Sequence, residues 1–288
     1  MKPKGLAMTI IFQAESANYG ESIGNVASLK KISRNNGDQY TYISRQALRY
    51  NMIEQLGEIT TPVSEGNKDK SVIQFASEAT IDKYPEIDFF GYLKTKEGSG
   101  GKKRSAKVRL SNAISLETFK GDLDFLTNKG LADRLENQYM NLAQSEIHKS
   151  YYCYTVTMDL DQIGIDGDIE VENSEKARRV NKLLDTISLL YRDIRGRRED
   201  LKPLFVVGGV YDVKNPIFQN TVKVENNRLN VLQIKDVLYD GIQENTYYGL
   251  VKGVFDNDSE IRESFDVVNV PDFFRTLKDK VIDYYESN

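Results

Sequence analysis

Apolar side chains along the chain follow two periods, one of two residues and one of three to four. Residues 5–13 alternate, with apolar side chains on both faces, and this pattern predicts a buried first strand. Residues 44–57 begin at a serine, end at a glycine and repeat an apolar side chain at every fourth position. These positions are Leu48, Met52 and Leu56. Because serine caps the first turn and glycine ends helices, the segment is predicted to be an amphipathic helix.

The second half of the chain shows the same two periods. A single apolar stripe predicts a helix over 174–194. Its members are Ala177, Val180, Leu184, Ile187, Tyr191 and Ile194. We expect the cations of Arg195–Arg198 to end this helix, where they would stabilise the negative end of its dipole. Strands are expected near 88–94, near 106–116 or 150–158, and at 203–211, and Pro271 is expected to open a last helix.

The remaining segments are expected to be loops and insertions. Residues 14–41 are rich in Asn, Gly and Ser and lack a helical period, which predicts a long functional loop. Residues 58–150 have the pattern of an insertion, helical in part within 117–149, where the helical spacing joins Leu131, Leu135, Tyr139 and Leu142. Residues 212–231 contain Asn-Pro, Asn-Asn and two short alternating segments, which predict a protruding hairpin.

The order of the regular elements indicates the fold class. Strand, helix, two strands, helix and strand follow one another, which is the βαββαβ order of a ferredoxin-like, RNA-recognition-type domain. The sequence therefore predicts an α+β fold in which residues 1–288 form a single domain with appendages at 58–150 and 212–231. The pattern tolerates other registers of the same strands.

Charge is distributed unevenly along a chain whose net charge is −4. Residues 22–53 carry five basic and one acidic side chain, and residues 94–110 carry seven basic and one acidic. The rest of the chain is therefore strongly acidic, with a net charge of −14. Two basic clusters on an acidic protein are the footprint expected when one face touches phosphates, although charges also cluster in loops for solubility.

The second basic cluster includes a flexible tip, Gly98-Ser-Gly-Gly-Lys-Lys-Arg104, between two expected strands. This tip superficially resembles a phosphate-binding loop. The resemblance fails because Lys103 stands where such a loop needs Ser or Thr, and because a strand rather than a helix follows. Two interpretations remain, a hairpin tip that grips nucleic-acid backbone and a loop without a binding role.

Composition limits the cellular setting. The single Cys153 excludes an intramolecular disulfide and suits a reducing cytoplasm. The chain has no run of 18 apolar residues, so no transmembrane helix is expected, and the first residues lack the pattern of a secretory signal. We therefore expect a cytoplasmic protein without a membrane partner.

The polar face of the helix expected over 44–57 carries candidate binding residues. Arg45 and Arg49 lie one turn apart, and Gln46 lies beside them near the positive end of the helix dipole. Two guanidiniums and an amide beside unpaired N–H groups suit a phosphate oxygen. The alternative is an ordinary amphipathic helix whose polar face is solvated.

Several runs together carry a resemblance to a known family. They are Asn18-Tyr-Gly-Glu-Ser-Ile-Gly-Asn25, Lys30-Lys31, Tyr42-Ile-Ser-Arg-Gln-Ala-Leu-Arg49, Pro85-Glu-Ile-Asp-Phe-Phe-Gly-Tyr92 and Val108-Arg-Leu-Ser-Asn-Ala113. In this order they resemble the Cas-seven backbone subunits of type I CRISPR (Cascade) surveillance complexes. These subunits belong to the RAMP superfamily, and the branch is also called the DevR autoregulator family. The resemblance is dense over residues 1–115 and loose afterwards.

The resemblance implies a hand-like fold with an RNA-recognition-like palm, a finger insertion at 58–150 and a thumb hairpin at 212–231. It also implies that copies stack in a helical filament along a CRISPR guide RNA (crRNA), together with other Cascade subunits, and leave the guide bases free to pair with target DNA. The residues implied in guide contact are Asn18, Asn25, Lys30, Lys31, Ser44, Arg45, Gln46 and Arg49. The basic tip residues Lys102, Lys103 and Arg104 are expected to contact target DNA.

Two other classes of function stay open. Related subunits of type III complexes cut RNA with a loop aspartate and a metal, and Asp38 is the one acid in the first basic cluster. No carboxylate, His or Cys cluster has metal-ligand spacing, and the lone His148 has no evident catalytic partner, so we expect no catalytic residue, no metal and no cofactor. The autoregulator name suggests a transcriptional regulator, but no helix-turn-helix with a basic recognition helix is present.

Overall fold

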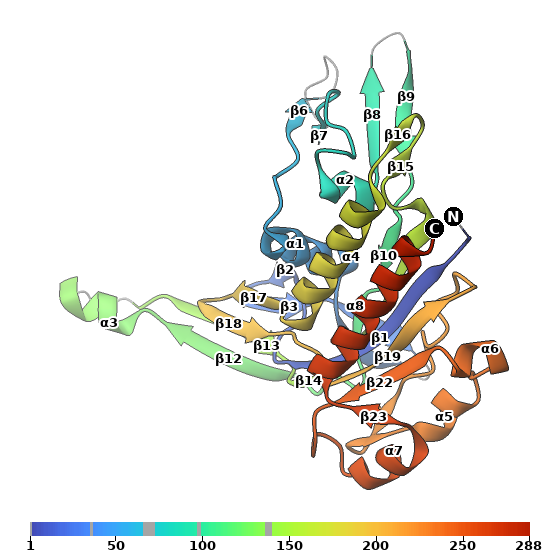
Figure 1. Ribbon diagram of the computed structural model, residues 1–288. Coiled ribbons are helices and arrows are strands. Elements are labelled where there is room, and N and C mark those ends of the chain that lie inside the picture. The colour runs from blue at the N-terminus through green and yellow to red at the C-terminus, as the bar shows by residue number, and fades with distance from the viewer. Residues whose placement is uncertain (1, 35–36, 66–72, 97–98, 136–139) are drawn as a thin grey trace.

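A computed structural model describes residues 2–34, 37–65, 73–96, 99–135 and 140–288. Among these residues the largest element is a nine-stranded sheet, hereafter the main sheet, in the order β23-β22-β19-β1-β14-β11-β5-β4, with β10 also pairing with β14 (Figure 1). Its strands are β1 (Gly5–Ala14), β4 (Lys31–Arg34), β5 (Asp38–Ile43), β10 (Val108–Leu110), β11 (Ala113–Ser115), β14 (Ser150–Asp159), β19 (Phe205–Tyr211), β22 (Thr246–Leu250) and β23 (Val267–Val268). The predicted strands at 5–13, 150–158 and 203–211 are confirmed.

Helices cover one face of the main sheet. The described helices are α1 (Arg45–Leu56), α2 (Pro85–Phe90), α3 (Lys129–Ala132), α4 (Asn173–Ser188), α5 (Val231–Lys235), α6 (Asp240–Gln243), α7 (Asp258–Ser264) and α8 (Val270–Glu286), with short 3-10 turns at Asp133–Leu135 and Leu160–Gln162. Figure 1 shows α4 and α8 side by side across the sheet, in contact with one another. The mixed α+β class expected from the sequence is confirmed.

Strand β1 contributes side chains to a hydrophobic core on each face of the main sheet, because alternate side chains of a strand point to opposite faces. Its even-numbered side chains, with those of β14, pack against α1, α4 and α8. Its odd-numbered Ala7 and Ile11 pack with Phe205, Val207 and the C-terminal segment that contains α5 and α7. The second core covers only part of that face, which leaves the surface over β10, β11 and part of β14 available to form a cleft.

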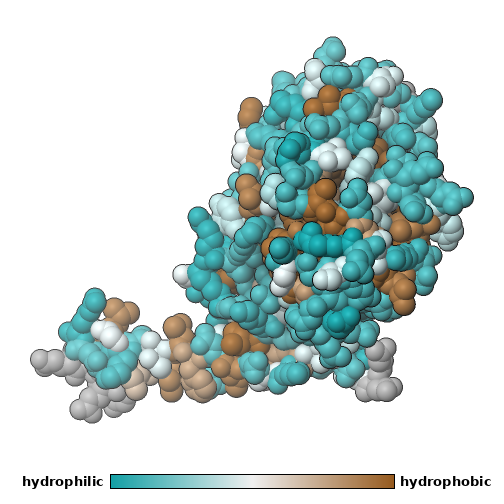
Figure 2. All heavy atoms as spheres, turned by 60° about the horizontal axis from the view of Figure 1, so that its bottom comes forward, coloured by the Kyte–Doolittle hydropathy of each residue, from teal (hydrophilic) through white to brown (hydrophobic). Residues whose placement is uncertain are grey.

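A second, four-stranded sheet extends away from the main sheet in the order β12-β13-β3-β2. Its strands are β2 (Tyr19–Ile23), β3 (Val26–Leu29), β12 (Asp122–Thr127) and β13 (Leu142–Ile147). We call β12, α3 and β13 the arm, which projects from the body in Figure 1. All residues of β12 are exposed, and Figure 2 shows apolar side chains along the projection. The side chain of Phe125 is 61% exposed.

Short hairpins complete the described structure. They are β6 (Val63–Glu65) with β7 (Ile73–Phe75), β8 (Tyr92–Lys96) with β9 (Ser99–Arg104), β15 (Ile165–Asp166) with β16 (Ile169–Glu170), β17 (Tyr191–Ile194) with β18 (Arg197–Asp200), and β20 (Val224–Glu225) with β21 (Arg228–Leu229). No helix among the described residues combines the length and the apolar composition needed to cross a membrane.

Two segments expected to be a loop and partly helical are built from strands. Residues 14–41 contain β2, β3 and β4 and the start of β5, and the described part of 117–149 contains β12, β13, the short helix α3 and the 3-10 turn Asp133–Leu135. Of the apolar positions proposed for a helix there, Tyr139 lies outside the described residues. The expectation of partial helicity in 117–149 is met at α3 and the 3-10 turn that follows it, but Leu142 lies on β13. The loop expected over 14–41 was wrong because its strands pair with distant segments, as β3 does with β13, and local periodicity does not register such pairing.

The strand expected near 88–94 is confirmed only in its second half, because residues 88–90 belong to a helix and 92–94 to β8. Helix α2 spans Pro85–Phe90, opens with a proline in its first turn and buries Phe89 and Phe90, and β8 begins only at Tyr92. The run of aromatic residues resembles a strand in sequence, but the proline fixes a helical φ at its start.

The long helix predicted over 174–194 ends early. Helix α4 stops at Ser188, and the last two members of its predicted stripe, Tyr191 and Ile194, lie on β17. The basic run therefore does not end a helix. Instead Arg195 and Gly196, both with positive φ, turn the chain from β17 into β18.

The hairpin predicted at 212–231 exists but does not protrude. Asn226 and Asn227, both with positive φ, join the two-residue strands β20 and β21. The apolar side chains of Val222, Val224 and Leu229 are buried in the second core. Burial of these side chains holds the hairpin against the body.

Candidate nucleic-acid interface

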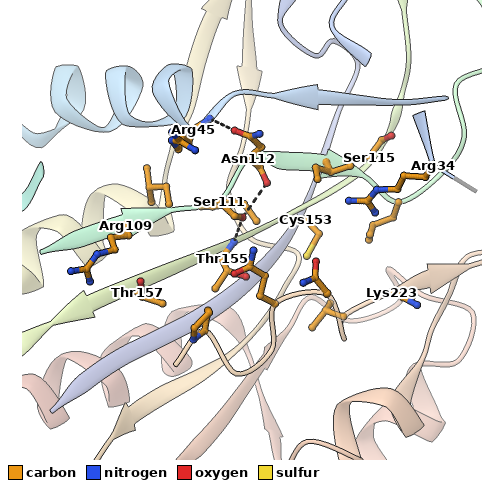
Figure 3. Close-up of a pocket in the computed structure, with 18 of the residues that line it drawn as sticks. Arg34, Arg45, Arg109, Ser111, Asn112, Ser115, Cys153, Thr155, Thr157 and Lys223 are labelled. Carbon is orange, nitrogen blue, oxygen red and sulfur yellow. Dashed lines mark hydrogen bonds between the residues drawn. The ribbon is translucent and has the colours of Figure 1, made fainter. Parts of the chain in front are cut away.

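A cleft of about 940 Å³ lies on the main-sheet face opposite α4 and α8, beside the part of that face that the second core covers (Figure 3). Strands β10, β11 and β14 contribute to its floor, the amino end of α1 lies at one side, and residues 214–223 line another side. Five cationic side chains line it: Arg34, Arg45, Arg109, Lys214 and Lys223. Hydroxyl and amide side chains lie between them: Ser111, Asn112, Ser115, Thr155, Thr157, Gln219 and Asn220. The chemistry of this lining suits an anionic, hydrogen-bonding chain.

Helix α1 begins at the cleft as the sequence predicts. Ser44 Oγ accepts the Ala47 N–H at 3.3 Å, and Gly57 ends the helix with φ +63°. Asn112 Oδ1 accepts the Arg45 N–H at 2.9 Å. Two of the first N–H groups are thus already paired within the protein. A ligand at this helix end would therefore meet the positive end of the dipole and the exposed Arg45 side chain, and fewer unpaired N–H groups than an uncapped helix offers.

The cleft cations differ in their internal partners. Arg109 donates two bonds to the Asp159 carboxylate, at 3.0 and 2.9 Å, and this carboxylate raises the pKa of Arg109. Lys214 lies 2.5 Å from an Asp161 oxygen. For Arg34, Arg45 and Lys223, no carboxylate of the described residues lies within ion-pair distance. These three carry uncompensated positive charge toward the cleft.

The cleft floor offers no platform for base stacking. Among its lining residues the one aromatic is Tyr154, whose side chain is buried in the core against Phe12. The neighbouring β14 positions are Cys153, Thr155 and Thr157. Readers of single-stranded bases use exposed aromatic rings, whereas cations and hydroxyls contact phosphate and ribose. The floor is therefore suited to the backbone of a nucleic acid and not to its bases.

The predicted guide contacts lie around Ser44 and at the two ends of β3, and they have different roles. Asn18 Nδ2 donates to Ser44 Oγ at 3.2 Å, and the Asn18 backbone bonds to Tyr42 and Lys30, so Asn18 holds these segments together. Asn25 and Lys30 expose their side chains. Gln46 is exposed beside Arg45.

Two predicted guide contacts are engaged with internal carboxylates. Lys31 Nζ lies 2.5 Å from Glu146 Oε2. Arg49 lies 3.4 Å from Glu86, and its guanidinium lies 4.8 Å from the Phe90 ring centroid. Arg49 is not among the residues that line the cleft, although Arg45 one turn earlier is. The helical spacing of the two arginines therefore does not give them the same environment.

The residues of the basic tip also differ in whether they have partners within the protein. Lys102 and Lys103 are exposed on β9. Arg104 is buried: its guanidinium donates to Asp88 Oδ1 at 2.6 Å and to the Gln162 carbonyl at 3.0 Å. Asp88 is itself fully buried and also binds Arg179. Arg104 thus anchors the β8–β9 hairpin to the body and is not available to a ligand. Of the three tip residues, Lys102 and Lys103 are the candidate contacts with DNA.

Sequence reasoning missed most of the cleft lining. Arg34 and Arg109 lie within the two basic clusters, so charge counting could have singled them out. Lys214 and Lys223 lie in the acidic remainder of the chain, and Asn112 is one polar residue among many. Only the fold brings these five side chains together with Arg45.

The candidate catalytic residues have other surroundings. Asp38 is exposed at the start of β5, opposite Arg34 in the strand register. Among the described residues, no three His, Cys, Asp or Glu side chains are grouped so that they could hold a metal ion. His148 is buried, its Nδ1 lies 2.8 Å from Thr41 Oγ1, and burial lowers its pKa. These contacts indicate that His148 contributes to the packing of the fold.

Comparisons with known proteins agree with one another. The model of a family described as "CRISPR-associated negative auto-regulator DevR/Csa2" matches residues 6–230. A chain of a "CRISPR RNA-guided surveillance complex, pre-nicking" shares the fold with a TM-score of 0.64 and 11% identity, covering 98% of this chain and 100% of that chain. A chain of a second "CRISPR RNA-guided surveillance complex" gives a TM-score of 0.56 and 12% identity, covering 97% and 99%. A comparison with curated proteins found no significant sequence match.

Proposed function

Because the chain belongs to the DevR/Csa2 family of CRISPR-associated proteins, we propose that it is the non-catalytic subunit that holds the guide RNA backbone in a type I CRISPR surveillance complex. The observation that carries this proposal is the cleft. It presents Arg34, Arg45 and Lys223, none of which has a carboxylate partner in the part of the chain that the structure describes, above a floor that lacks a stacking ring. A subunit that must accept every guide sequence needs contacts with phosphate and ribose and no contacts that read bases.

In this proposal the main sheet is an RNA-recognition-like palm. The elements β1, α1, β10 with β11, β14, α4 and β19 follow one another along the chain, and the strands are ordered β19-β1-β14-β11. Strand β14 pairs antiparallel with β1, β10 and β11, and β1 pairs antiparallel with β19. This order supports the βαββαβ palm expected from the sequence. The guide would lie across the face opposite α4 and α8.

We also propose that copies of the chain stack along the guide through the arm. The arm leaves Leu123, Phe125 and Leu142 largely exposed, and an apolar surface of this kind is typical of a contact with another protein. An arm that meets a different surface of the next copy gives an open, head-to-tail stack, as a filament along one strand requires. Because residues 212–231 lie against the body, we assign the role of the thumb to the arm and not to 212–231.

The proposal is tested by the nucleic acid that the protein carries. Protein expressed with its CRISPR locus and purified at moderate salt should contain small RNAs that share repeat-derived ends and differ in their internal sequence. The matched variant Arg34→Ala/Arg45→Ala should contain several-fold less RNA per protein. Protein that is free of RNA, or that carries RNA fragments without common ends, would refute the assignment.

Target DNA is a separate part of the proposal. Lys102 and Lys103 lie exposed on β9, away from the residues that line the cleft. A Lys102→Ala/Lys103→Ala variant in the guide-loaded complex should bind target duplex more weakly while retaining wild-type amounts of guide. Equal loss of guide and target would place these lysines on the guide instead.

The non-catalytic assignment has its own test. Complementary RNA incubated with the guide-loaded complex and Mn²⁺ should stay intact. Cuts at fixed positions that disappear in an Asp38→Ala variant would instead show a metal-dependent endoribonuclease.

A further inference from the structure

The main sheet and the four-stranded sheet that includes the arm strands, hereafter the arm sheet, meet at a compact cluster that the proposed function does not use. The chain passes from β3 to β4 through Lys30, from β11 to β12 through residues 116–121, and from β13 to β14 through residues 148–149. Leu29, Lys31, Phe119, Glu146 and His148 come from these three crossings or from the strand ends beside them, and we call them the joint. Each crossing joins a strand of one sheet to a strand of the other.

One carboxylate spans the first crossing. Glu146 Oε2, on β13, accepts the Leu29 N–H at 2.7 Å and lies 2.5 Å from Lys31 Nζ. Leu29 ends β3 of the arm sheet, and Lys31 begins β4 of the main sheet. The Glu146 carboxylate therefore holds both sides of Lys30 at once. The side chains of Lys31 and Glu146 are only 17% and 16% exposed, so water screens this pair less than a surface pair.

Aromatic contacts close the joint behind this ion pair. Lys31 Nζ lies 4.2 Å from the Phe119 ring centroid, and Phe119 meets His148 edge to face at 5.6 Å. His148 Nδ1 lies 2.8 Å from Thr41 Oγ1, and Thr41 is the residue opposite Lys31 in the β4–β5 register. The contacts thus return to Lys31 and link these three crossings. A fourth crossing runs from β1 to β2 through residues 15–18.

The preceding lysine has a different setting. Lys30 exposes its side chain, while its backbone is fixed by bonds from its N–H to the Asn18 carbonyl at 2.7 Å and from the Tyr42 N–H to its carbonyl at 3.1 Å. Lys30 and Lys31 are thus identical side chains at adjacent positions, one free toward solvent and one held in the joint.

We propose that the Lys31–Glu146 pair locks the angle between the two sheets and thereby fixes the direction of the arm. Lys31 is a positioning residue in this account and does not contact the guide, whereas Lys30 supplies the guide contact of this dipeptide. The statement about the arm stands on the contacts of the joint alone, and the statement about Lys30 rests on the proposed function.

The arm direction can be measured directly on the full chain. Spin labels on cysteines introduced by Gly130→Cys, at the arm tip, and Asp279→Cys, on α8, report the distance between arm and body in a Cys153→Ser background. A Cβ at Gly130 meets no atom within 4 Å, so a label fits there. Circular dichroism and thermal unfolding show which variants are folded, and only folded protein enters the comparison.

We expect one narrow distance distribution for the parent and for the matched control Lys30→Met. Lys31→Met and Glu146→Gln should broaden or shift the distribution, and Lys31→Arg, which keeps the cation, should restore it. Should either variant fail to fold, amide hydrogen exchange of the parent provides a second readout: β12 and β13 should exchange faster with rising salt, which weakens the ion pair. A narrow parent-like distribution in Lys31→Met and Glu146→Gln would overturn the proposal.

Binding of a short single-stranded RNA, long enough for one copy, separates the two statements. Lys31→Met should bind within about twofold of the parent, and Lys30→Met should bind about fourfold more weakly, the change expected for one lost phosphate contact. Equal weakening by both variants would make Lys31 a ligand and overturn its positioning role. Unchanged binding by Lys30→Met would contradict the proposed guide contact of Lys30. It would not affect the conclusion about the direction of the arm.

Discussion

Replacing Arg34 and Arg45 with alanine removes two cations that face the cleft without a carboxylate partner among the described residues. Both side chains are exposed, and the guanidinium of Arg34 lies 5.7 Å from the Tyr40 ring centroid. Neither replacement empties a core site, so the fold should persist. The variant therefore isolates the contribution of these two charges to RNA binding.

The expected magnitude follows from counterion release. Each contact between a cation and a phosphate of a single strand contributes about 0.7 to the slope of log K against log salt. At about 0.15 M salt one lost contact corresponds to about a fourfold loss of affinity, and two correspond to about fifteenfold. The slope itself should become shallower by about 1.4.

Fluorescence anisotropy with labelled single-stranded RNA measures both quantities in a salt titration. Two RNAs of equal length and unrelated sequence should lose the same affinity, because phosphate contacts do not read bases. Arg49→Ala is the matched control one helical turn away, and it should change binding little because Arg49 already contacts Glu86 and Phe90. A loss that depends on RNA sequence, or an equal loss in Arg49→Ala, would refute the assignment of the cleft.

Three further predictions concern the scaffold that carries the cleft. Asp88→Asn should lower the free energy of unfolding by about 3–5 kcal/mol in urea titrations, because it leaves two buried guanidiniums without a full counter-charge. Gly208→Ala should cost about 1–3 kcal/mol, since its Cβ would overlap the Ala7 carbonyl oxygen on the neighbouring strand, whereas a Cβ at Gly241 meets nothing within 4 Å and Gly241→Ala serves as control. Hydrogen bonds from two arginines lower the pKa of Glu175 to about 2, so its stabilising effect is complete above its ordinary pKa of 4.5 and is lost as the pH falls toward 2. The stability difference between the parent and Glu175→Gln should shrink over that range.

Each of these has a result that would contradict it. Parent-like unfolding of Asp88→Asn would mean that the two guanidiniums find other acceptors. Equal stability of the Gly208→Ala and Gly241→Ala variants would mean that the central strands can separate without cost. A stability difference for Glu175→Gln that stays constant between pH 5 and pH 2 would assign the contribution of Glu175 to packing and not to its charge.

Elements whose sequence signals lie within their own residues were predicted well. The helix over 44–57 was found with its Ser44 cap and Gly57 end because both signals lie within the element. The strands at 5–13 and 203–211 carry continuous apolar patterns that a buried central strand requires. In the second of these strands Gly208 lies against Ala7 and Met8, a close backbone approach that the lack of a side chain allows.

Elements that lack a local signal and form through pairing with distant segments were not predicted. Strands β3 and β13 are exposed or half-buried over most of their length and pair with each other across more than a hundred residues, so neither shows a period that marks it. Helix α4 ends six residues before the predicted end at 194. The last members of its predicted apolar stripe lie instead on β17, which pairs with β18 across the turn.

The candidate site shows the same division. The sequence by itself determined that cations gather in two clusters, that a capped helix presents Arg45 at its amino end, and that the chain resembles its family. Only the tertiary structure decided which cations remain free, because their carboxylate partners lie far away along the chain: Glu146 is 115 residues from Lys31, and Glu86 is 37 residues from Arg49. Local sequence sets where charge is placed, and the folded contacts set whether that charge is neutralised inside the protein or left for a ligand.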